Sequence, residues 1–205
     1  MTRGLLLIIS GPSGVGKTTI TRAVERHFAA PHPAAAVFSV SATTRPKTDA
    51  DREGVDYHFV SDEEFDRLIA EGAFLEYAGV FGKRYGTLRK WVEERLAEGR
   101  LVILEIDVQG AINVKRQMPD ALGIFVLPPS EDVLLERLRA RKREPEEVIQ
   151  RRFAEAKREI ATARTCGAYD AFIVNDALDD AVAEAIRVVQ SRLGGATDGH
   201  RSTQI

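Results

Sequence analysis

The chain has 205 residues, of which 44% are hydrophobic and 29% are charged, and its formal net charge is −2. This length is sufficient for one domain with a buried core and appended lobes, and the near-neutral charge gives no support for a nucleic-acid partner. The single cysteine, Cys166, excludes an intramolecular disulfide.

The first apolar run, Leu5–Ile9, is too short for a signal peptide or a membrane span and predicts a buried strand. No later segment is apolar enough to cross a bilayer, so we expect a cytoplasmic protein. Further runs of strand length occur at Val37–Val40, Leu101–Ile106, Leu122–Leu127 and Ala171–Val174. Because several runs are apolar throughout and alternate with segments of helical periodicity, we expect an α/β fold with a mostly parallel central sheet.

Local signals predict where several helices begin and end. Ser61–Glu64 is a capping box that precedes an apolar helical face. Thr87 is suited to cap a helix that ends at Gly99, and Pro145 is suited to the first position of a later helix. Apolar residues at helical spacing predict a final amphipathic helix over Leu178–Leu193.

Two stretches interrupt the alternation of strands and helices. Residues 41–60 are polar and rich in loop-forming residues, and residues 137–158 hold nine basic residues among helical signals. Each stretch is interpreted as a mobile lobe inserted into the core. Residues 194–205 are mostly small and polar, which predicts a disordered tail.

A glycine-rich loop lies between the first strand and the first helix. Residues 11–18 read Gly-Pro-Ser-Gly-Val-Gly-Lys-Thr and match G-x-x-x-x-G-K-[ST] in full. Glycines let several backbone N–H groups point at one phosphate, and the helix N-terminus adds partial positive charge. We expect Lys17 to reach the β- and γ-phosphates and the Thr18 hydroxyl to bind Mg²⁺. The predicted triphosphate-binding residues are Gly11, Pro12, Ser13, Gly14, Val15, Gly16, Lys17, Thr18 and Thr19.

This loop indicates a nucleoside triphosphate and does not by itself separate a kinase from a GTPase or an ATPase. Five further motifs follow it, in the order S-x-S-x-T-T-R, D-Y-x-F, F-L-E, Y-G-T and E-I-D-x-Q-G. They begin at Ser39, Asp56, Phe74, Tyr85 and Glu105. Together with the loop they resemble guanylate kinase over about residues 4 to 190.

The resemblance implies a P-loop NTPase core with an inserted GMP-binding lobe and a helical lid. It also implies an enzyme of purine nucleotide metabolism that transfers the γ-phosphate of ATP in line to GMP, with Mg²⁺ as cofactor and dGMP as an open alternative acceptor. The implied domain covers residues 1–193. Its core comprises 1–36, 97–134 and 160–193, its GMP-binding lobe 37–96, and its lid 135–159.

The resemblance also assigns residues to the acceptor. Arg45 would grip the GMP phosphate through both arms of its guanidinium. Glu76 and Asp107 would accept hydrogen bonds from guanine N1–H and the 2-amino group. Adenine offers an acceptor at N1 and no 2-amino group, so these carboxylates would reject it. The implied GMP-binding residues are Ser41, Arg45, Tyr57, Glu76, Tyr85, Thr87 and Asp107.

One departure concerns the GMP phosphate. In the family a second arginine follows the first by three positions, and here that position is Thr48. Lys47 and Arg52 lie nearby, but a lysine lacks the guanidinium fork, so we expect weaker or rearranged phosphate binding. Asp107 also fits the acidic residue that supports Mg²⁺ in P-loop proteins. We favour guanine contact for Asp107 and an indirect role for Glu105.

On the donor side, residues 137–152 resemble the family's lid. Arg137 and Arg152 are expected to reach the ATP phosphates, Arg141 to lie near the adenine, and Asn175 to contact it. The family's R-G-T-[DE] run reads Arg-Lys-Arg-Glu at residues 141–144, without the glycine and threonine. The implied catalytic residues are Lys17, Arg45, Arg137 and Arg152.

Three alternatives remain. A kinase for a different phosphorylated acceptor would not need the Glu76 and Asp107 pair. A guanylate-kinase-like binding module without catalysis would be expected to lack the loop lysine or the lid arginines, but Lys17 and Arg152 are present. A P-loop GTPase would carry an N-K-x-D motif, which the sequence does not contain. The oligomeric state has no signal in the sequence.

Overall fold

The computed structural model describes residues 4–30, 35–80, 82–140 and 145–198. Its centre is a five-stranded sheet with the order β2-β7-β1-β8-β9, in which every neighbouring pair is parallel. The strands are β1 (Leu5–Ser10), β2 (Ala36–Phe38), β7 (Leu101–Glu105), β8 (Leu122–Leu127) and β9 (Ala171–Val174). All five predicted strands form this sheet, which confirms the expected α/β class.

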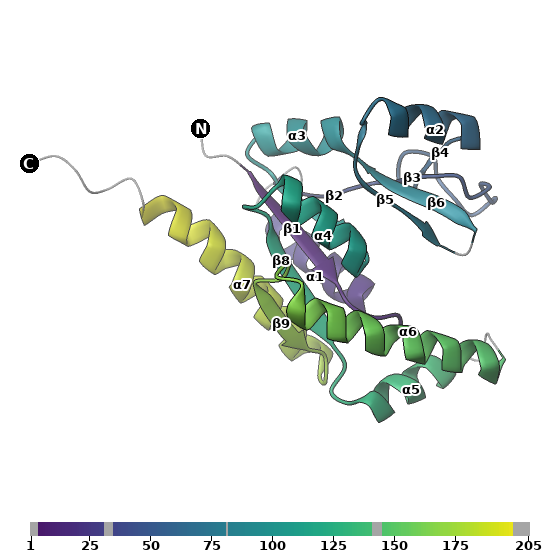
Figure 1. Ribbon diagram of the computed structural model, residues 1–205. Coiled ribbons are helices and arrows are strands. Elements are labelled where there is room, and N and C mark those ends of the chain that lie inside the picture. Colours follow the sequence, from purple (N-terminus) through teal and green to yellow (C-terminus); the bar gives the residue numbers. More distant parts are fainter. Residues whose placement is uncertain (1–3, 31–34, 81, 141–144, 199–205) are drawn as a thin grey trace, which may run out of the picture.

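Alternate residues of β1 pack against different helices, as the two-residue period of a strand requires. Leu7 and Ile9 are buried with apolar residues of α1 (Lys17–Ala29) and α7 (Leu178–Asp198). Leu6 and Ile8 are buried with residues of α3 (Arg89–Ala97) and α4 (Val108–Gln117) on the opposite face. The sheet is therefore covered on both faces (Figure 1), which explains its continuous apolar runs.

A second, smaller sheet lies to one side of this core (Figure 1). Its order is β4-β3-β6-β5, with β3 parallel to β4 and the other pairs antiparallel. Its strands are β3 (Ala42–Thr43), β4 (His58–Phe59), β5 (Phe74–Val80) and β6 (Lys83–Leu88). Helix α2 (Asp62–Ala70) packs on it through Phe65, which is fully buried with Ala42 and Phe74. Residues 41–60 were expected to be loop, but they contain β3 and β4, whose two residues each are too few to show an alternating pattern. The longer strands β5 and β6 were not predicted either.

On the other side of the core, α5 (Glu131–Ala140) and α6 (Glu146–Thr165) pack against each other in the predicted lid region (Figure 1). Leu134, Leu138, Ile149 and Ala156 form their shared apolar cluster. This cluster reaches the glycine-rich loop, because a Cβ added at Gly14 would lie 3.1 Å from Leu138. In the ranges described, no helix combines the length and apolar character needed to cross a membrane.

Some predicted helix ends are confirmed and others are wrong. Ser61 caps α2 by accepting a hydrogen bond from the Glu64 N–H, as the capping box predicts. Thr87 does not cap a helix: it lies in β6, and α3 begins after Leu88. Its hydroxyl donates to the Glu76 carboxylate. Pro145 lies immediately before the first residue of α6.

Two predicted domain boundaries fall inside elements of the core. The proposed lobe 37–96 takes in most of β2 and of α3, but β2 pairs with β7 and α3 packs on the parallel sheet. The tail predicted to be disordered from residue 194 is also corrected in part, because α7 continues to Asp198. The apolar spacing that marked this helix ends at Leu193, but the backbone hydrogen bonds continue past it. Residues 199–205 lie outside the described residues.

A close contact between β8 and the backbone before β9 generates a stability prediction. A Cβ at Gly123 would lie 2.2 Å from the Ala168 carbonyl oxygen. Because both backbones are held in the core, we expect Gly123→Ala to lower the free energy of unfolding by about 2 kcal/mol or more, measured by urea unfolding. Gly79→Ala in β5 is the matched control, since a Cβ there meets nothing within 4 Å. Equal unfolding midpoints for the two variants would contradict the prediction.

Candidate active site

The glycine-rich loop connects β1 to α1 at the carboxyl edge of the parallel sheet. Gly16 precedes α1 with φ of 92°, a conformation that favours glycine, and a Cβ there would lie 2.6 Å from the Asn175 amide nitrogen. The Lys17 ammonium donates hydrogen bonds to the Gly11 carbonyl at 2.5 Å and the Pro12 carbonyl at 3.1 Å. The lysine is therefore held across the loop, close to where the loop N–H groups would meet a phosphate.

Asn175, the residue immediately after β9, supports this loop. Its buried side-chain amide donates to the Val15 carbonyl at 2.7 Å, and the Arg137 guanidinium donates to the Asn175 carbonyl at 3.0 Å. Arg137 and Asn175, both predicted to bind ATP, are therefore in contact with each other, and Asn175 is in contact with the loop. The adenine contact expected for Asn175 stays a prediction. In this structure the side-chain amide nitrogen of Asn175 donates to the Val15 carbonyl.

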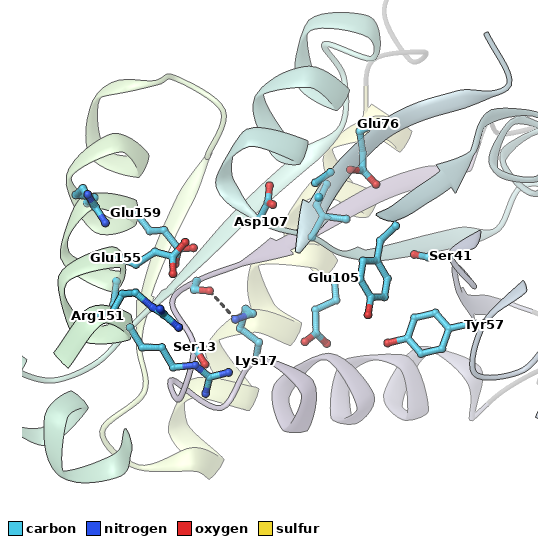
Figure 2. Close-up of a pocket in the computed structure, with 18 residues that line it drawn as sticks. Ser13, Lys17, Ser41, Tyr57, Glu76, Glu105, Asp107, Arg151, Glu155 and Glu159 are labelled. Atoms are coloured by element: carbon cyan, nitrogen blue, oxygen red, sulfur yellow. Dashed lines mark hydrogen bonds between the residues drawn. The ribbon is translucent and has the colours of Figure 1, made fainter. Parts of the chain in front are cut away.

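A cavity of about 800 Å³ opens between the loop, the second sheet and α6. Figure 2 shows side chains from all three regions directed into it. Predicted site residues that line it are Gly11, Ser13, Lys17, Ser41, Tyr57, Glu76, Tyr85, Asp107 and Arg152. Thr87 and Arg45 adjoin it through contacts with Glu76 and Tyr57 respectively. Arg141 lies outside the described residues, and Thr19 is exposed on α1.

At one end of the cavity a carboxylate is buried without a cationic partner among the described residues. Glu76 in β5 is 7% exposed and accepts a hydrogen bond of 2.6 Å from the Thr87 hydroxyl. Burial raises the pKa of Glu76 to about 7, the Thr87 hydrogen bond opposes this rise, and the nearby Asp107 charge adds to it. Asp107 is the N-cap of α4 and accepts a hydrogen bond of 2.7 Å from the Gly110 N–H. The two carboxylates therefore form an acceptor-rich end of the cavity.

Aromatic rings and an arginine surround a second region of the cavity. The rings of Tyr57 and Tyr85 lie 5.7 Å apart, and the Arg45 guanidinium lies 5.2 Å from the Tyr57 ring centre. Arg45 donates two hydrogen bonds to Asp51, at 2.8 and 3.0 Å. The residue at the departure from the family pattern, Thr48, binds the same carboxylate. Asp51 was not among the predicted site residues, because the motif that contains Arg45 ends at that arginine.

The acidic residue beside Thr18 is Glu105, at the end of β7. The Thr18 hydroxyl donates to Glu105 Oε1 at 2.7 Å, while Glu105 Oε2 is buried without a hydrogen-bond partner in the described part of the chain. Asp107 caps α4 instead. A hydroxyl and an unsatisfied carboxylate oxygen are hard donors of the kind that Mg²⁺ prefers. Within the described ranges, no group of three or more His, Cys, Asp or Glu residues is arranged to hold a metal by itself.

Helix α6 contributes more charged groups than the sequence analysis selected. Arg151, Arg152, Glu155, Arg158 and Glu159 all line the cavity, and Figure 2 shows the carboxylates of Glu155 and Glu159 on the side that faces Lys17. Burial raises the pKa of Glu159 to about 7, and the Lys17 charge opposes that rise. The spacing of residues 152, 155 and 159 places them on one helical face, which is the signal that could have found the two glutamates.

Comparison with known proteins agrees with this arrangement. The family model for guanylate kinase matches residues 3–192. A guanylate kinase from Anaeromyxobacter dehalogenans (strain 2CP-C) is 49% identical over 188 residues, which cover 91% of this chain and 80% of the relative. Another, from Vibrio parahaemolyticus serotype O3:K6, is 50% identical over 183 residues, which cover 89% of this chain and 85% of the relative.

A solved structure supports the same relationship. The crystal structure of guanylate kinase from Anaplasma phagocytophilum superimposes with a TM-score of 0.71 at 32% sequence identity, covering 93% of this chain and 86% of that one. The match therefore extends over the core, the second sheet and the lid helices together. The chain belongs to the guanylate kinase family.

Proposed function

We propose that this protein transfers the γ-phosphate of ATP to GMP, giving ADP and GDP, in the cavity between the second sheet and α6. The observation that carries the proposal is the buried Glu76, paired with Thr87 and next to Asp107, at the acceptor end of a cavity that also holds the phosphate loop. Within purine nucleotide metabolism this reaction recycles GMP. We place it in the cytoplasm, where a lone cysteine such as Cys166 stays reduced.

Guanine matches the acceptor end by hydrogen-bonding type. Its N1–H and 2-amino group are donors, and the acceptors are the carboxylates of Glu76, which is buried, and Asp107, which is exposed to the cavity. Adenine would present a lone pair at N1 to a buried carboxylate and leave it unpaired, a loss of about 1–3 kcal/mol or more for a charged group. Ser41, on the same side of the cavity in Figure 2, would add a hydroxyl near the base.

The transfer itself needs no general base from the protein. A phosphate monoester has a second pKa of about 6, so the GMP phosphate is largely a dianion at pH 7. One of its oxygens forms a bond to the γ-phosphorus as the bond from that phosphorus to the bridging oxygen breaks, and ADP leaves with the electron pair. The obstacle is repulsion between two anions, which Lys17, Arg45, Arg137 and Arg152 would offset while aligning the groups.

Thr18 and Glu105 would hold Mg²⁺ beside the phosphate loop, because the hydroxyl and the buried, unpartnered carboxylate oxygen provide suitable donors. When bound, the ion would supply positive charge to the β- and γ-phosphate oxygens. The second sheet and the pair α5–α6 stand on opposite sides of the loop (Figure 1). Their closure over both substrates would exclude water, which competes with GMP as acceptor.

The acceptor experiment tests the proposed function directly. ADP formation from ATP and Mg²⁺ is measured with GMP, AMP, UMP, CMP and no acceptor. We expect turnover with GMP to exceed turnover with AMP by about 10³-fold or more, because AMP offers no matching donor to the buried Glu76 carboxylate. Turnover with none of the four nucleotides, in a protein that still binds ATP, would rule out the proposed reaction.

The raised pKa of Glu76 predicts a pH dependence for GMP. Protonation removes the acceptor for guanine, so the KM for GMP should rise by about tenfold between pH 8 and pH 6. The GMP phosphate contributes only about twofold over this range. Glu76→Gln should raise the KM for GMP and remove all but this smaller dependence, while the KM for ATP is unchanged. A variant whose pH profile matches the wild type would contradict the assignment.

The same shift gives a stability prediction with a defined sign. A carboxyl whose pKa is raised from 4.5 to about 7 by folding destabilises the folded state increasingly as pH rises through this range. Glu76→Gln removes this effect. We therefore expect the free energy of unfolding of the variant, relative to that of the wild type, to be about 1–3 kcal/mol higher at pH 8 than at pH 4.5. Urea unfolding at both pH values measures the difference, and a constant difference would contradict burial of the charge as its cause.

The Thr18–Glu105 contact generates a metal prediction. Glu105→Gln keeps the side-chain volume but removes the charge beside the loop, so the Mg²⁺ concentration for half-maximal activity should rise by about tenfold. The KM for GMP should stay within about twofold of the wild type, because Glu105 is not assigned to the acceptor. Asp56→Asn, in the second-sheet region, is the charge-matched control. An unchanged Mg²⁺ titration in Glu105→Gln would remove Glu105 from the metal site.

A further inference from the structure

The arginine assigned to the GMP phosphate is already occupied by a carboxylate of the protein. Arg45 Nη2 donates to Asp51 Oδ1 at 2.8 Å, and Arg45 Nη1 donates to Asp51 Oδ2 at 3.0 Å. Two parallel bonds of this kind are the geometry in which a guanidinium binds a phosphate. Asp51 therefore uses the same donors that a GMP phosphate would require.

Thr48 strengthens the hold on Asp51. Its backbone N–H and its hydroxyl each donate to Asp51 Oδ2 at 2.7 Å. With the two bonds from Arg45, the carboxylate accepts four hydrogen bonds, and its side chain is only 14% exposed. The Arg45 hydrogen bonds and the Thr48 hydrogen bonds lower the pKa of Asp51 well below its ordinary value, so the group is an anion at any pH at which the enzyme would work.

Arg45 itself is fixed from its other side. Its guanidinium lies 5.2 Å from the Tyr57 ring centre and 5.3 Å from that of Phe59. These contacts hold the cation at the cavity margin whichever anion it binds. An exchange between anions at Arg45 would therefore displace Asp51, together with Thr48, which is exposed on the same loop.

We propose that Asp51 determines the affinity for GMP by occupying the Arg45 guanidinium, so that the GMP phosphate must displace it. This inference rests on the proposed function, because it takes GMP as the acceptor. The cost of displacement has two parts: the four hydrogen bonds that Asp51 loses, and the repulsion between its charge and the phosphate dianion that replaces it. Thr48 stands where the family pattern has a second arginine, so one guanidinium serves both anions.

The first variant is Asp51→Asn, which keeps the shape of the side chain and removes its charge. Steady-state kinetics with ATP should give a KM for GMP lower by about five- to tenfold, with the KM for ATP unchanged. Isothermal titration of GMP without ATP should show the same fold-change in Kd. Thr48→Ala removes one donor to Asp51, so its change should have the same direction and a smaller size of about twofold.

Asp49→Asn is the matched control. Asp49 is exposed on the same loop, two residues from Asp51, and its replacement removes the same charge without releasing Arg45. Thermal unfolding of each variant establishes that it is folded, and Thr48→Ala tests the inference independently if Asp51→Asn does not fold. An equal fall in KM in Asp49→Asn and Asp51→Asn, or no fall in Asp51→Asn and Thr48→Ala, would overturn the role of Asp51.

The two proposals fail in different ways. If the wild type binds GMP and turns it over, and Asp51→Asn has the same Kd for GMP, the role of Asp51 is refuted and the proposed function stands. If Asp51→Asn binds GMP more tightly than the wild type does, but neither protein forms ADP with GMP, the proposed reaction is refuted and the competition at Arg45 is supported. A wild-type protein with neither binding nor turnover of GMP would refute both.

Discussion

The parallel pairing of β1 with β7 is the constraint on which the site depends. Ile9 lies opposite Glu105 in this register, so the loop after β1 and the segment after β7 leave the same edge of the sheet side by side. The Thr18–Glu105 hydrogen bond joins these two segments across 87 positions of sequence. A shift of one residue in this register would turn Glu105 toward the opposite face and separate the phosphate loop from its acidic neighbour.

The buried carboxylate of Glu76 lowers the stability of the folded protein. Glu76 is buried where its ionised form is unfavourable, and neither Thr87, which donates to it, nor Asp107, whose charge acts on it, is a cation. A fold selected for stability alone would place an uncharged residue there. An acceptor that is desolvated before the ligand arrives instead provides discrimination, because a ligand without the matching donors leaves the cost unrelieved.

In contrast to Glu76, the cationic side chains of the site have acceptors within the protein. Arg45 and Arg137 each have protein acceptors in this structure: Asp51 for the first and the Asn175 carbonyl for the second. Lys17 is likewise held by loop carbonyls. Satisfying these cations limits the repulsion among them when no phosphate is bound. It also means that phosphate binding is an exchange of acceptors, so net affinity depends on the acceptor that is lost as much as on the one gained.

The sequence was sufficient for features that depend on local pattern. The five apolar runs predicted the parallel sheet, because strands covered on both faces are apolar throughout. Residues 11–18 predicted a phosphate loop between β1 and α1, and Ser61 a helix cap, because these signals depend on a few neighbouring residues. The ordered motifs predicted the family, which the comparisons confirm.

Only the tertiary structure decided how distant groups are paired. Thr87 has the local pattern of a helix cap, but a buried carboxylate from β5 takes its hydroxyl. The second sheet includes β3 and β4, which have two residues each and so no periodicity to detect, and it forms only when four separate strands pair. Asp51 was not singled out, and Glu105 was given only an indirect role, because their contacts are with Arg45 and Thr18. These side chains are brought to them by the folding of the loop and by strand register. The sequence pattern predicted the strands of the parallel sheet and the phosphate loop, whereas the second sheet and the pairing of charges were decided by packing.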